Sequence, residues 1–241
     1  GLAYYRDESV IPLQNFNRYS MHAAIDQELG KWFKVGVSTN TNYSVTNGSD
    51  ISLYNTLSMT PIANPYNADG TMKARVSMAN DDQWVYTKKS LEDLGSSFKD
   101  QTKAFGTYNN FYGEFKFPWV DGLKYRMNLG LNYRNSDYGN YVGQGVFSNT
   151  DNSKSHATDR TQNTTNWAIE HMLTYDHTWG KHTINAVALY SAEQTTFRQR
   201  YISGLDIPND AFQFYNMGQA ANITIDPGAQ AYYKAGLVSY M

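Results

Sequence analysis

The chain has 241 residues, a formal net charge of −2 and no cysteine. The near-neutral charge offers no basic surface for nucleic acid, and the missing cysteine excludes disulfides, thiolate metal sites and cysteine nucleophiles. Charged residues make up only 17%, against about 25% in an ordinary soluble domain. Aromatic residues reach 15%, and Tyr and Trp suit membrane interfaces and sugar-binding surfaces alike.

Strand-like alternation begins near the N-terminus. Residues 1–7 are predicted to be the end of a strand, and residues 18–29 and 33–45 alternate between apolar and polar side chains. The two longer segments flank a tight turn at 30–32. Because side chains point to opposite faces of a strand with period two, each segment has one apolar and one polar face. This pattern predicts a long amphipathic hairpin.

The segment 46–104 interrupts this alternation. It is rich in Asn, Asp, Ser and Gly and contains Pro61 and Pro65. A short helical turn is predicted within it at 89–94. A connection of nearly sixty residues is unusual in a compact soluble domain but typical of an extracellular loop of an outer-membrane barrel.

The clearest hairpin is predicted at 105–135. From residue 123 onward the odd positions are apolar and the even positions are polar, charged or Gly: Leu123, Tyr125, Met127, Leu129, Leu131 and Tyr133 against Lys124, Arg126, Asn128, Gly130, Asn132 and Arg134. The two arms are joined by a turn at 118–122. They are about twice as long as the usual strand of about 5–6 residues, which is the length that a tilted strand needs to cross a bilayer.

The pattern then repeats. A polar loop is predicted at 136–163, a third hairpin at 166–176 and 184–196 around a turn at 178–182, a further loop at 198–230 and a last strand from 231. In the arm 184–196, Val187 and Leu189 compete with Ala186, Ala188 and Tyr190 for the outer face, so its orientation stays open. The fold class predicted is all-β: an antiparallel transmembrane β-barrel fragment of about seven long strands.

The two kinds of connection predict the orientation. Short turns beside Trp32, Trp119 and Trp179 indicate the periplasmic rim, and long loops indicate the extracellular side. The apolar face is expected to meet lipid. The chain begins and ends close to or within strands. We therefore expect residues 1–241 to be an internal part of a larger barrel domain.

Catalytic and metal-binding patterns are weak. Asp26 and Glu28 share one strand face, as a carboxylate pair would, but a solvated barrel wall with cross-strand ion pairs explains such charges more simply. The five histidines have no HExxH spacing, and no GxSxG motif is present. We therefore predict no enzyme activity, no metal and no cofactor.

Aromatic side chains among amides and carboxylates suggest ligand binding in the loops. Flat rings suit the CH faces of sugars, and the polar groups suit their hydroxyls, although the same residues serve equally well to pack loops together. The candidate ligand-binding residues are Tyr54, Tyr66, Asp82, Trp84, Tyr86 and Tyr141.

Several segments resemble the SusC/RagA-type TonB-dependent outer-membrane transporters of Bacteroidetes. The resemblance is carried by stretches that extend over nearly the whole chain: 15–21 (NFNRYSM), 30–36 (GKWFKVG), 61–67 (PIANPYN), 107–113 (TYNNFYG), 122–126 (GLKYR) and 188–194 (ALYSAEQ). It implies a multi-pass protein of the Gram-negative outer membrane, with a plug and a TonB box outside this chain.

The resemblance also implies partners and cargo. These are TonB, a SusD-like surface lipoprotein, outer-membrane lipid and an oligosaccharide, with starch-derived maltooligosaccharides favoured and no nucleic acid. The alternatives are a passive porin or surface adhesin barrel, and a soluble all-β carbohydrate-binding module.

Overall fold

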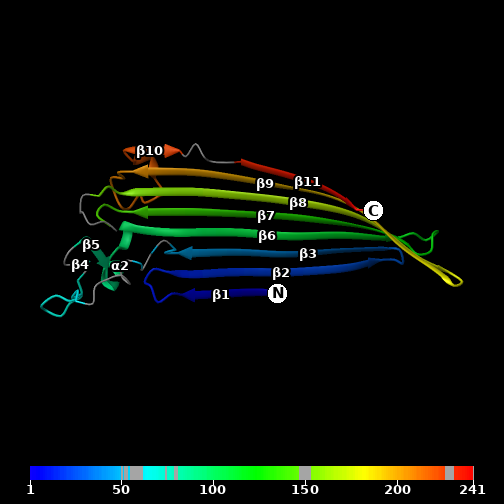
Figure 1. Ribbon diagram of the computed structural model, residues 1–241, viewed down its shortest axis with the longest axis horizontal. Coiled ribbons are helices and arrows are strands. Elements are labelled where there is room, and N and C mark those ends of the chain that lie inside the picture. Colours follow the sequence, from blue (N-terminus) through cyan, green and yellow to red (C-terminus); the bar gives the residue numbers. More distant parts are fainter. Residues whose placement is uncertain are drawn as a thin grey trace.

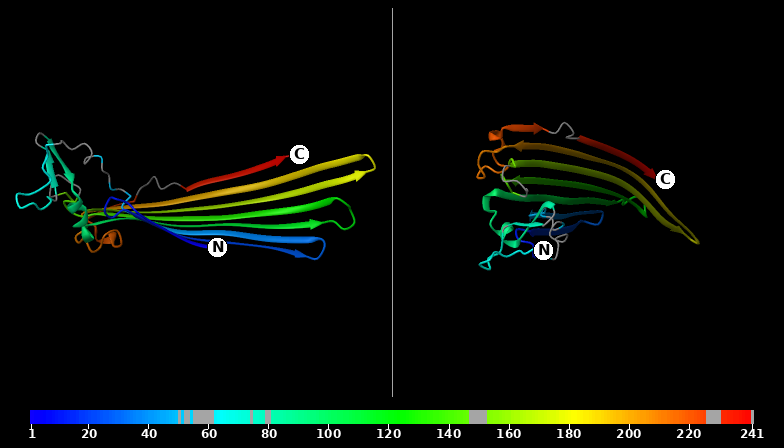
Figure 2. Two further views of the ribbon diagram at one scale, coloured as in Figure 1. Left: turned by 90° about the horizontal axis from the view of Figure 1, so that it is seen from below. Right: turned by 60° about the vertical axis from the view of Figure 1, so that its left-hand side comes forward.

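A computed structural model describes residues 1–49, 51, 54, 62–73, 75–78, 81–146, 153–225 and 231–240, with the backbone alone at 75, 77, 78, 81–86, 225 and 231–240. The chain forms one large antiparallel sheet of nine strands, curved across its width (Figures 1 and 2). Its strands follow the order β1-β2-β3-β6-β7-β8-β9-β10, and β11 also pairs with β9. The predicted fold class is confirmed, with nine strands in place of about seven.

The strands of this sheet become longer from β1 to β9, whereas β10 and β11 are short. Their bounds are β1 Leu2–Glu8, β2 Asn15–Leu29, β3 Phe33–Asn47, β6 Phe98–Lys116, β7 Leu123–Val142, β8 His156–Trp179, β9 His182–Leu205, β10 Asn222–Ile225 and β11 Ala231–Tyr240. β8 and β9 have 24 residues each. Among the described residues no helix is long and apolar enough to span a membrane.

Three hairpin turns lie at one end of the sheet and the longer connections at the other (Figure 1). Gly30, Gly122 and Gly180 provide the positive φ angles that these turns require. Gly122 is also restricted by space, because a Cβ there would lie 1.9 Å from the Asp176 carbonyl oxygen. The predicted turns are therefore confirmed.

The three predicted long loops are shorter than expected, and these bounds are corrected here. β6 begins at Phe98, inside the predicted loop 46–104; β7 and β8 extend into 136–163; and β9 extends into 198–230. These extensions are rich in Asn, Thr, Gln and Asp, so they lack the clean apolar alternation of the lower strands. Backbone pairing and loop packing hold them as strands nonetheless.

The connection between β3 and β6 has structure of its own. It contains a small two-stranded sheet, β4 (Arg75–Met78) and β5 (Asp81–Tyr86), followed by the helix α2 (Lys88–Glu92). Thr87 and Ser90 form a capping box at the start of α2. The helical turn predicted at 89–94 is confirmed, but it starts one residue earlier and ends two residues earlier than predicted.

The side chains divide into an apolar and a polar face that continue from strand to strand. Directly opposed residues lie on the same face, and the register runs without a shift from β1 to β9. One row through the middle of the apolar face is Ile25, Val37, Phe111, Leu129, Ile169 and Ala192. The open orientation of 184–196 is thereby settled: Ala186, Ala188 and Tyr190 lie on the apolar face and Val187 and Leu189 on the polar face.

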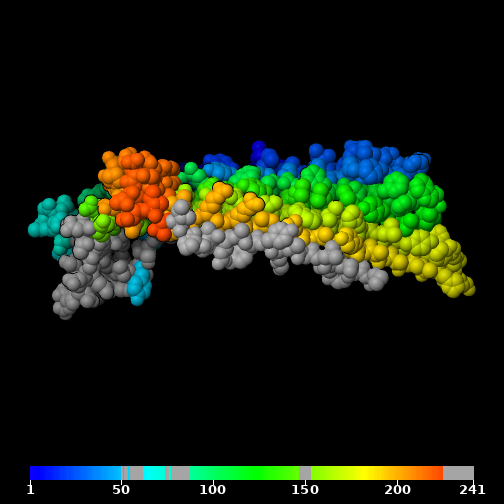
Figure 3. All heavy atoms as spheres, turned by 90° about the horizontal axis from the view of Figure 1, so that it is seen from above, coloured from blue at the N-terminus to red at the C-terminus, as the bar shows by residue number. Residues whose placement is uncertain are grey.

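Buried side chains concentrate at the end of the sheet that carries the longer connections, which we call the head. The head comprises the ends of β6, β7 and β8 with the loop segments packed on them. Phe98 and Val142 pack on the polar face with Ile51 and Leu91, whereas Tyr141 and Ala157 pack on the apolar face with Ile207 and Met217. Figure 2 shows the segments 62–97 and 206–221 on opposite sides of the sheet. Elsewhere the strands lie side by side as a bare wall (Figure 3).

Candidate functional site

Two rows of aromatic side chains border the apolar face. The row nearer the head, called the loop-end row, consists of Tyr4, Tyr19, Tyr43, Phe105 and Tyr133. Its members stand close together, with ring centroids 4.9 Å apart for Tyr4 and Tyr19 and 6.4 Å apart for Phe105 and Tyr133. Tyrosine at such a border presents an apolar ring and a polar hydroxyl, which suits a boundary between hydrocarbon and water.

The second row, called the turn-end row, lies at the hairpin turns and consists of Trp32, Phe33, Phe115, Phe117, Trp119, Tyr125, Tyr175 and Trp179. Trp119, predicted to mark the rim, contacts Phe117 at 5.8 Å between ring centroids and is 73% exposed. Phe33 and Tyr43 are ten residues apart in β3. With a rise of about 3.4 Å per residue and a tilt of about 40°, the two rows are about 25 Å apart in height, the thickness of the apolar band of a barrel.

The polar face carries a row of alternating charges near the turns. Glu28, Lys34, Glu114 and Arg126 oppose one another in sequence across β2, β3, β6 and β7. Arg126 lies 3.8 Å from the carboxylate of Glu114. The predicted cross-strand pairing of the charged residues is therefore confirmed for Glu114 and Arg126.

A tyrosine spans the same face one row higher. The hydroxyl of Tyr112 donates a hydrogen bond of 2.5 Å to the carboxylate of Asp26, and its ring lies over Gly36, where a Cβ would be 2.2 Å from the ring. The guanidinium of Arg126 stands 4.2 Å from the ring centroid. Asp26 thus has a structural partner.

Amide side chains line the middle of the polar face. Asn132 donates to Asn166 at 3.1 Å, and Asn166 donates to Thr195 at 2.8 Å, so one chain of hydrogen bonds crosses three strands. Asn128 donates to Glu170 at 3.2 Å. Amides both donate and accept hydrogen bonds, so this face can bind hydroxyl groups or peptide groups. Sequence alternation identified these residues as polar without indicating that they form a continuous network.

The structure describes the ligand-binding residues predicted from the sequence only in part. Tyr54 and Tyr66 are 75% and 49% exposed, and Tyr66 forms a β-bridge with Met72. The backbone of Asp82, Trp84 and Tyr86 forms β5, but their side chains lie outside the described part of the structure. Whether any of them binds a ligand stays a prediction.

Tyr141 occupies the interior of the head. Its side chain is completely buried, and its hydroxyl donates a hydrogen bond of 2.6 Å to Asp210. It therefore offers no surface to a ligand in this structure and anchors the segment 206–221 to β7. Burial raises the pKa of the Tyr141 phenol, and the hydrogen bond to Asp210 raises it further.

The anchor can be tested with Tyr141→Phe. The variant leaves Asp210 without its buried donor, so we expect the docking of segment 206–221 to weaken by about 1–3 kcal/mol. Hydrogen exchange of amides in 206–221 should accelerate, whereas Tyr215→Phe, at a side chain that is 64% exposed, should leave it unchanged. Because the folded-state pKa is raised, this contribution is complete below the ordinary phenol pKa of 10.0 and is lost as pH rises above it. Unchanged exchange in Tyr141→Phe would contradict the anchor.

Two curated relatives match nearly the whole chain. It is 25% identical to the TonB-dependent receptor P3 of Formosa agariphila over 251 aligned positions, which cover 94% of this chain and 23% of that protein. It is 23% identical to the TonB-dependent receptor P39 of the same organism, covering 91% of this chain and 20% of the relative. The chain thus spans about a quarter or less of the length of these relatives. No protein-family model matches it.

Solved structures show the same fold. The structure of the RagAB peptide transporter superimposes with a TM-score of 0.70 at 14% identity, over 98% of this chain and 26% of the other. The RagAB peptide importer in its open-open state gives a TM-score of 0.67 over 94% of this chain and 24% of the other. The predicted resemblance to TonB-dependent outer-membrane proteins is confirmed, and these relatives are named as receptors and transporters, not as enzymes.

Proposed function

Because the chain is similar to TonB-dependent receptors along 94% of its length, we propose that residues 1–241 form part of the barrel wall of an outer-membrane importer of the SusC/RagA type. One observation carries this proposal: a continuous apolar face bordered by two aromatic rows about 25 Å apart. In this arrangement the apolar face meets lipid, the turn-end row marks the periplasmic rim and the head projects from the cell. Each long strand then crosses the outer membrane once, which makes the protein multi-pass.

The polar face then lines the path of the cargo. We propose oligosaccharides of the maltooligosaccharide type as the cargo, because a wall rich in Asn, Thr and Tyr matches the hydroxyls and CH faces of sugars. Uptake would be driven through TonB, which acts on parts of the protein outside this chain. A SusD-like lipoprotein would sit on the extracellular side, against the head.

Peptides are a second cargo class supported by a specific observation. The solved structures that share this fold belong to a transporter named for peptides. Peptide groups also pair with amides, so the amide network of the polar face suits peptide and sugar equally. A passive porin or adhesin barrel is the remaining alternative, and a soluble carbohydrate-binding module is disfavoured by the apolar face.

Calorimetry of the full transporter with its lipoprotein separates the cargo classes. We expect heat of binding with maltooligosaccharides and none with levan. If only peptides give heat of binding, the cargo is peptide and not sugar. A parallel uptake assay in cells without functional TonB should show no accumulation of cargo. Uptake that persists without TonB would favour the passive porin.

A further inference from the structure

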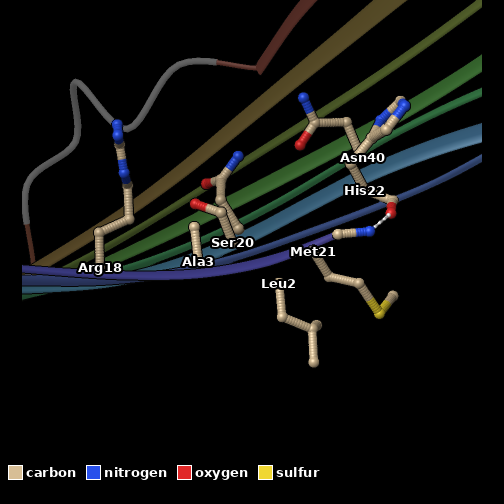
Figure 4. A pocket seen from close by; sticks show the side chains of 9 residues that line it. Leu2, Ala3, Arg18, Ser20, Met21, His22 and Asn40 are labelled. Carbon is tan, nitrogen blue, oxygen red and sulfur yellow. Dashed lines mark hydrogen bonds between the residues drawn. The ribbon is translucent and has the colours of Figure 1, made fainter.

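A recess lies on the polar face of β1, β2 and β3, close to the loop-end row (Figure 4). Its volume is about 440 Å³, and its polar lining comes from alternate residues of neighbouring strands: Arg18, Ser20, His22, Asn40 and Asn42. Figure 4 shows Arg18, Ser20, His22 and Asn40 on one side of the strands and Leu2 and Met21 on the other. The recess therefore opens towards the proposed cargo path and away from lipid.

Small side chains create the space. Gly1 and Ala3 line the recess, and Gly106 on β6 lies opposite the lining residue Asn42. A Cβ at Gly106 would be 3.3 Å from the Asn42 amide oxygen, so a larger residue there would press on the lining. Tyr5 on β1 lies directly opposite Arg18.

Among the described residues no carboxylate pairs with Arg18, whose guanidinium lies 6.0 Å from the centroid of the Tyr5 ring. Lys34, by contrast, stands between Glu28 and Glu114, and Arg126 lies beside Glu114. Arg134 on the same face also pairs with no described carboxylate, but it does not line the recess. No Asp or Glu lines the recess.

The lining is therefore complementary to an anion. Arg18 offers a planar guanidinium with several N–H donors, which fits the two oxygens of a carboxylate. Asn40, Asn42 and Ser20 add neutral donors, and His22 adds a ring that can donate from either nitrogen. A neutral sugar would use the amides but would leave the guanidinium without a counter-charge.

We propose that this recess binds a carboxylate group of the imported cargo, with Arg18 as its main ligand. The inference rests on the proposed import function, because it requires cargo to pass the polar face. It favours peptides or acidic oligosaccharides over neutral maltooligosaccharides as that cargo. It goes further by assigning charge selectivity to one position of the wall. The carboxylate can come from a peptide C-terminus or from a uronic acid of an oligosaccharide, and the binding chemistry is the same.

The test uses the full transporter with its lipoprotein and the variant Arg18→Gln. The matched control is Arg6→Gln, which removes the same charge from the apolar face of the adjacent strand. Four probes separate the sources: a tetrapeptide with a free C-terminus, the same peptide amidated, a tetragalacturonate and a maltotetraose. Dissociation constants are measured by calorimetry, and thermal melting reports on folding.

We expect Arg18→Gln to weaken binding of at least one carboxylate-bearing probe about tenfold or more, because a charge-assisted hydrogen bond is lost. Its uncharged counterpart should bind as before, and Arg6→Gln should change neither. The probe that responds identifies the source of the carboxylate.

Equal binding of charged and uncharged probes by the wild-type protein would overturn the inference. A lowered melting temperature with equal loss of all probes would also overturn it, since Arg18 would then pair with a carboxylate of the protein. Failure of every probe to bind the wild-type protein would instead refute the proposed import of sugars or peptides.

Discussion

Replacing Leu129 by Arg is expected to destabilise the folded barrel by about 2–4 kcal/mol, the cost of a cation at the middle of a lipid-facing surface. Leu129 lies halfway between the two aromatic rows, directly opposite Phe111 and Ile169 on the apolar face. A guanidinium there has no water and no carboxylate within its row. Urea titration of the full-length wild-type and Leu129→Arg proteins in lipid vesicles measures this difference in the free energy of unfolding.

The control is Asn128→Arg, one residue away and on the polar face. Its side chain stands beside Glu170 and faces the water-filled side, so we expect a change of less than about 0.5 kcal/mol. The two variants add the same side chain to the same strand and differ only in the face. Equal destabilisation by both would refute the assignment of the apolar face to lipid.

The second large effect is expected at Gly36. A Cβ introduced by Gly36→Ala would lie 2.2 Å from the Tyr112 ring and 2.3 Å from the Asp26 carboxylate. The ring must therefore swing away, which breaks its hydrogen bond to Asp26 and its contact with Arg126. At a buried position such as Gly36, inserting a methyl group where no space exists costs about 1–3 kcal/mol. We therefore expect Gly36→Ala to lower the free energy of unfolding by about 1–3 kcal/mol.

A double-mutant cycle with Tyr112→Ala identifies the cause. If the ring is what the methyl group displaces, Gly36→Ala should cost little in the Tyr112→Ala background, which gives a coupling energy of about 1 kcal/mol or more. Gly113→Ala serves as the control on the opposite face, because its Cβ would meet the Phe33 ring at 3.9 Å, an ordinary contact. Additive effects at Gly36 and Tyr112 would show that the glycine is needed for another reason.

The part of the fold between the aromatic rows was predictable from the sequence. In 123–133 every odd residue is apolar and every even residue is polar, charged or Gly, and each of the three hairpin turns contains a glycine. Such alternation follows from a strand with lipid on one side and water on the other. The strand positions, their turns and, except for β9, the orientation of the faces follow from it.

The head was not predictable in the same way. Above the loop-end row both faces of β7 are covered by protein or meet water, so Tyr141 packs against a loop and Val142 packs on the opposite face. Neither face of 136–142 meets lipid, so the segment lacks the apolar alternation of the lower strand. Its sequence therefore indicated a loop, although it forms part of β7. Tyr141 among polar neighbours suggested a ligand site, whereas its burial depends on Asp210, 69 positions later.

The orientation of β9 shows why the partner strand matters. Ala186, Ala188 and Tyr190 are hardly more apolar than Val187 and Leu189, so the strand alone favours neither face. Pairing of Ala188 with Leu173 and of Ala192 with Ile169 fixes the choice. The recess around Arg18 was equally hidden, because its lining comes from three strands and only their register brings Arg18, His22 and Asn40 together.

The unbroken register has a consequence for how this wall can vary in length. Between β2 and β9 no bulge absorbs an extra residue, so inserting or deleting one residue within β7 would exchange the two faces over the rest of that strand. Leucines would enter the water-filled side and amides would meet lipid. Insertions and deletions among homologous proteins should therefore accumulate at 48–97, 143–155 and 206–221, and a change within a strand should come in steps of two residues.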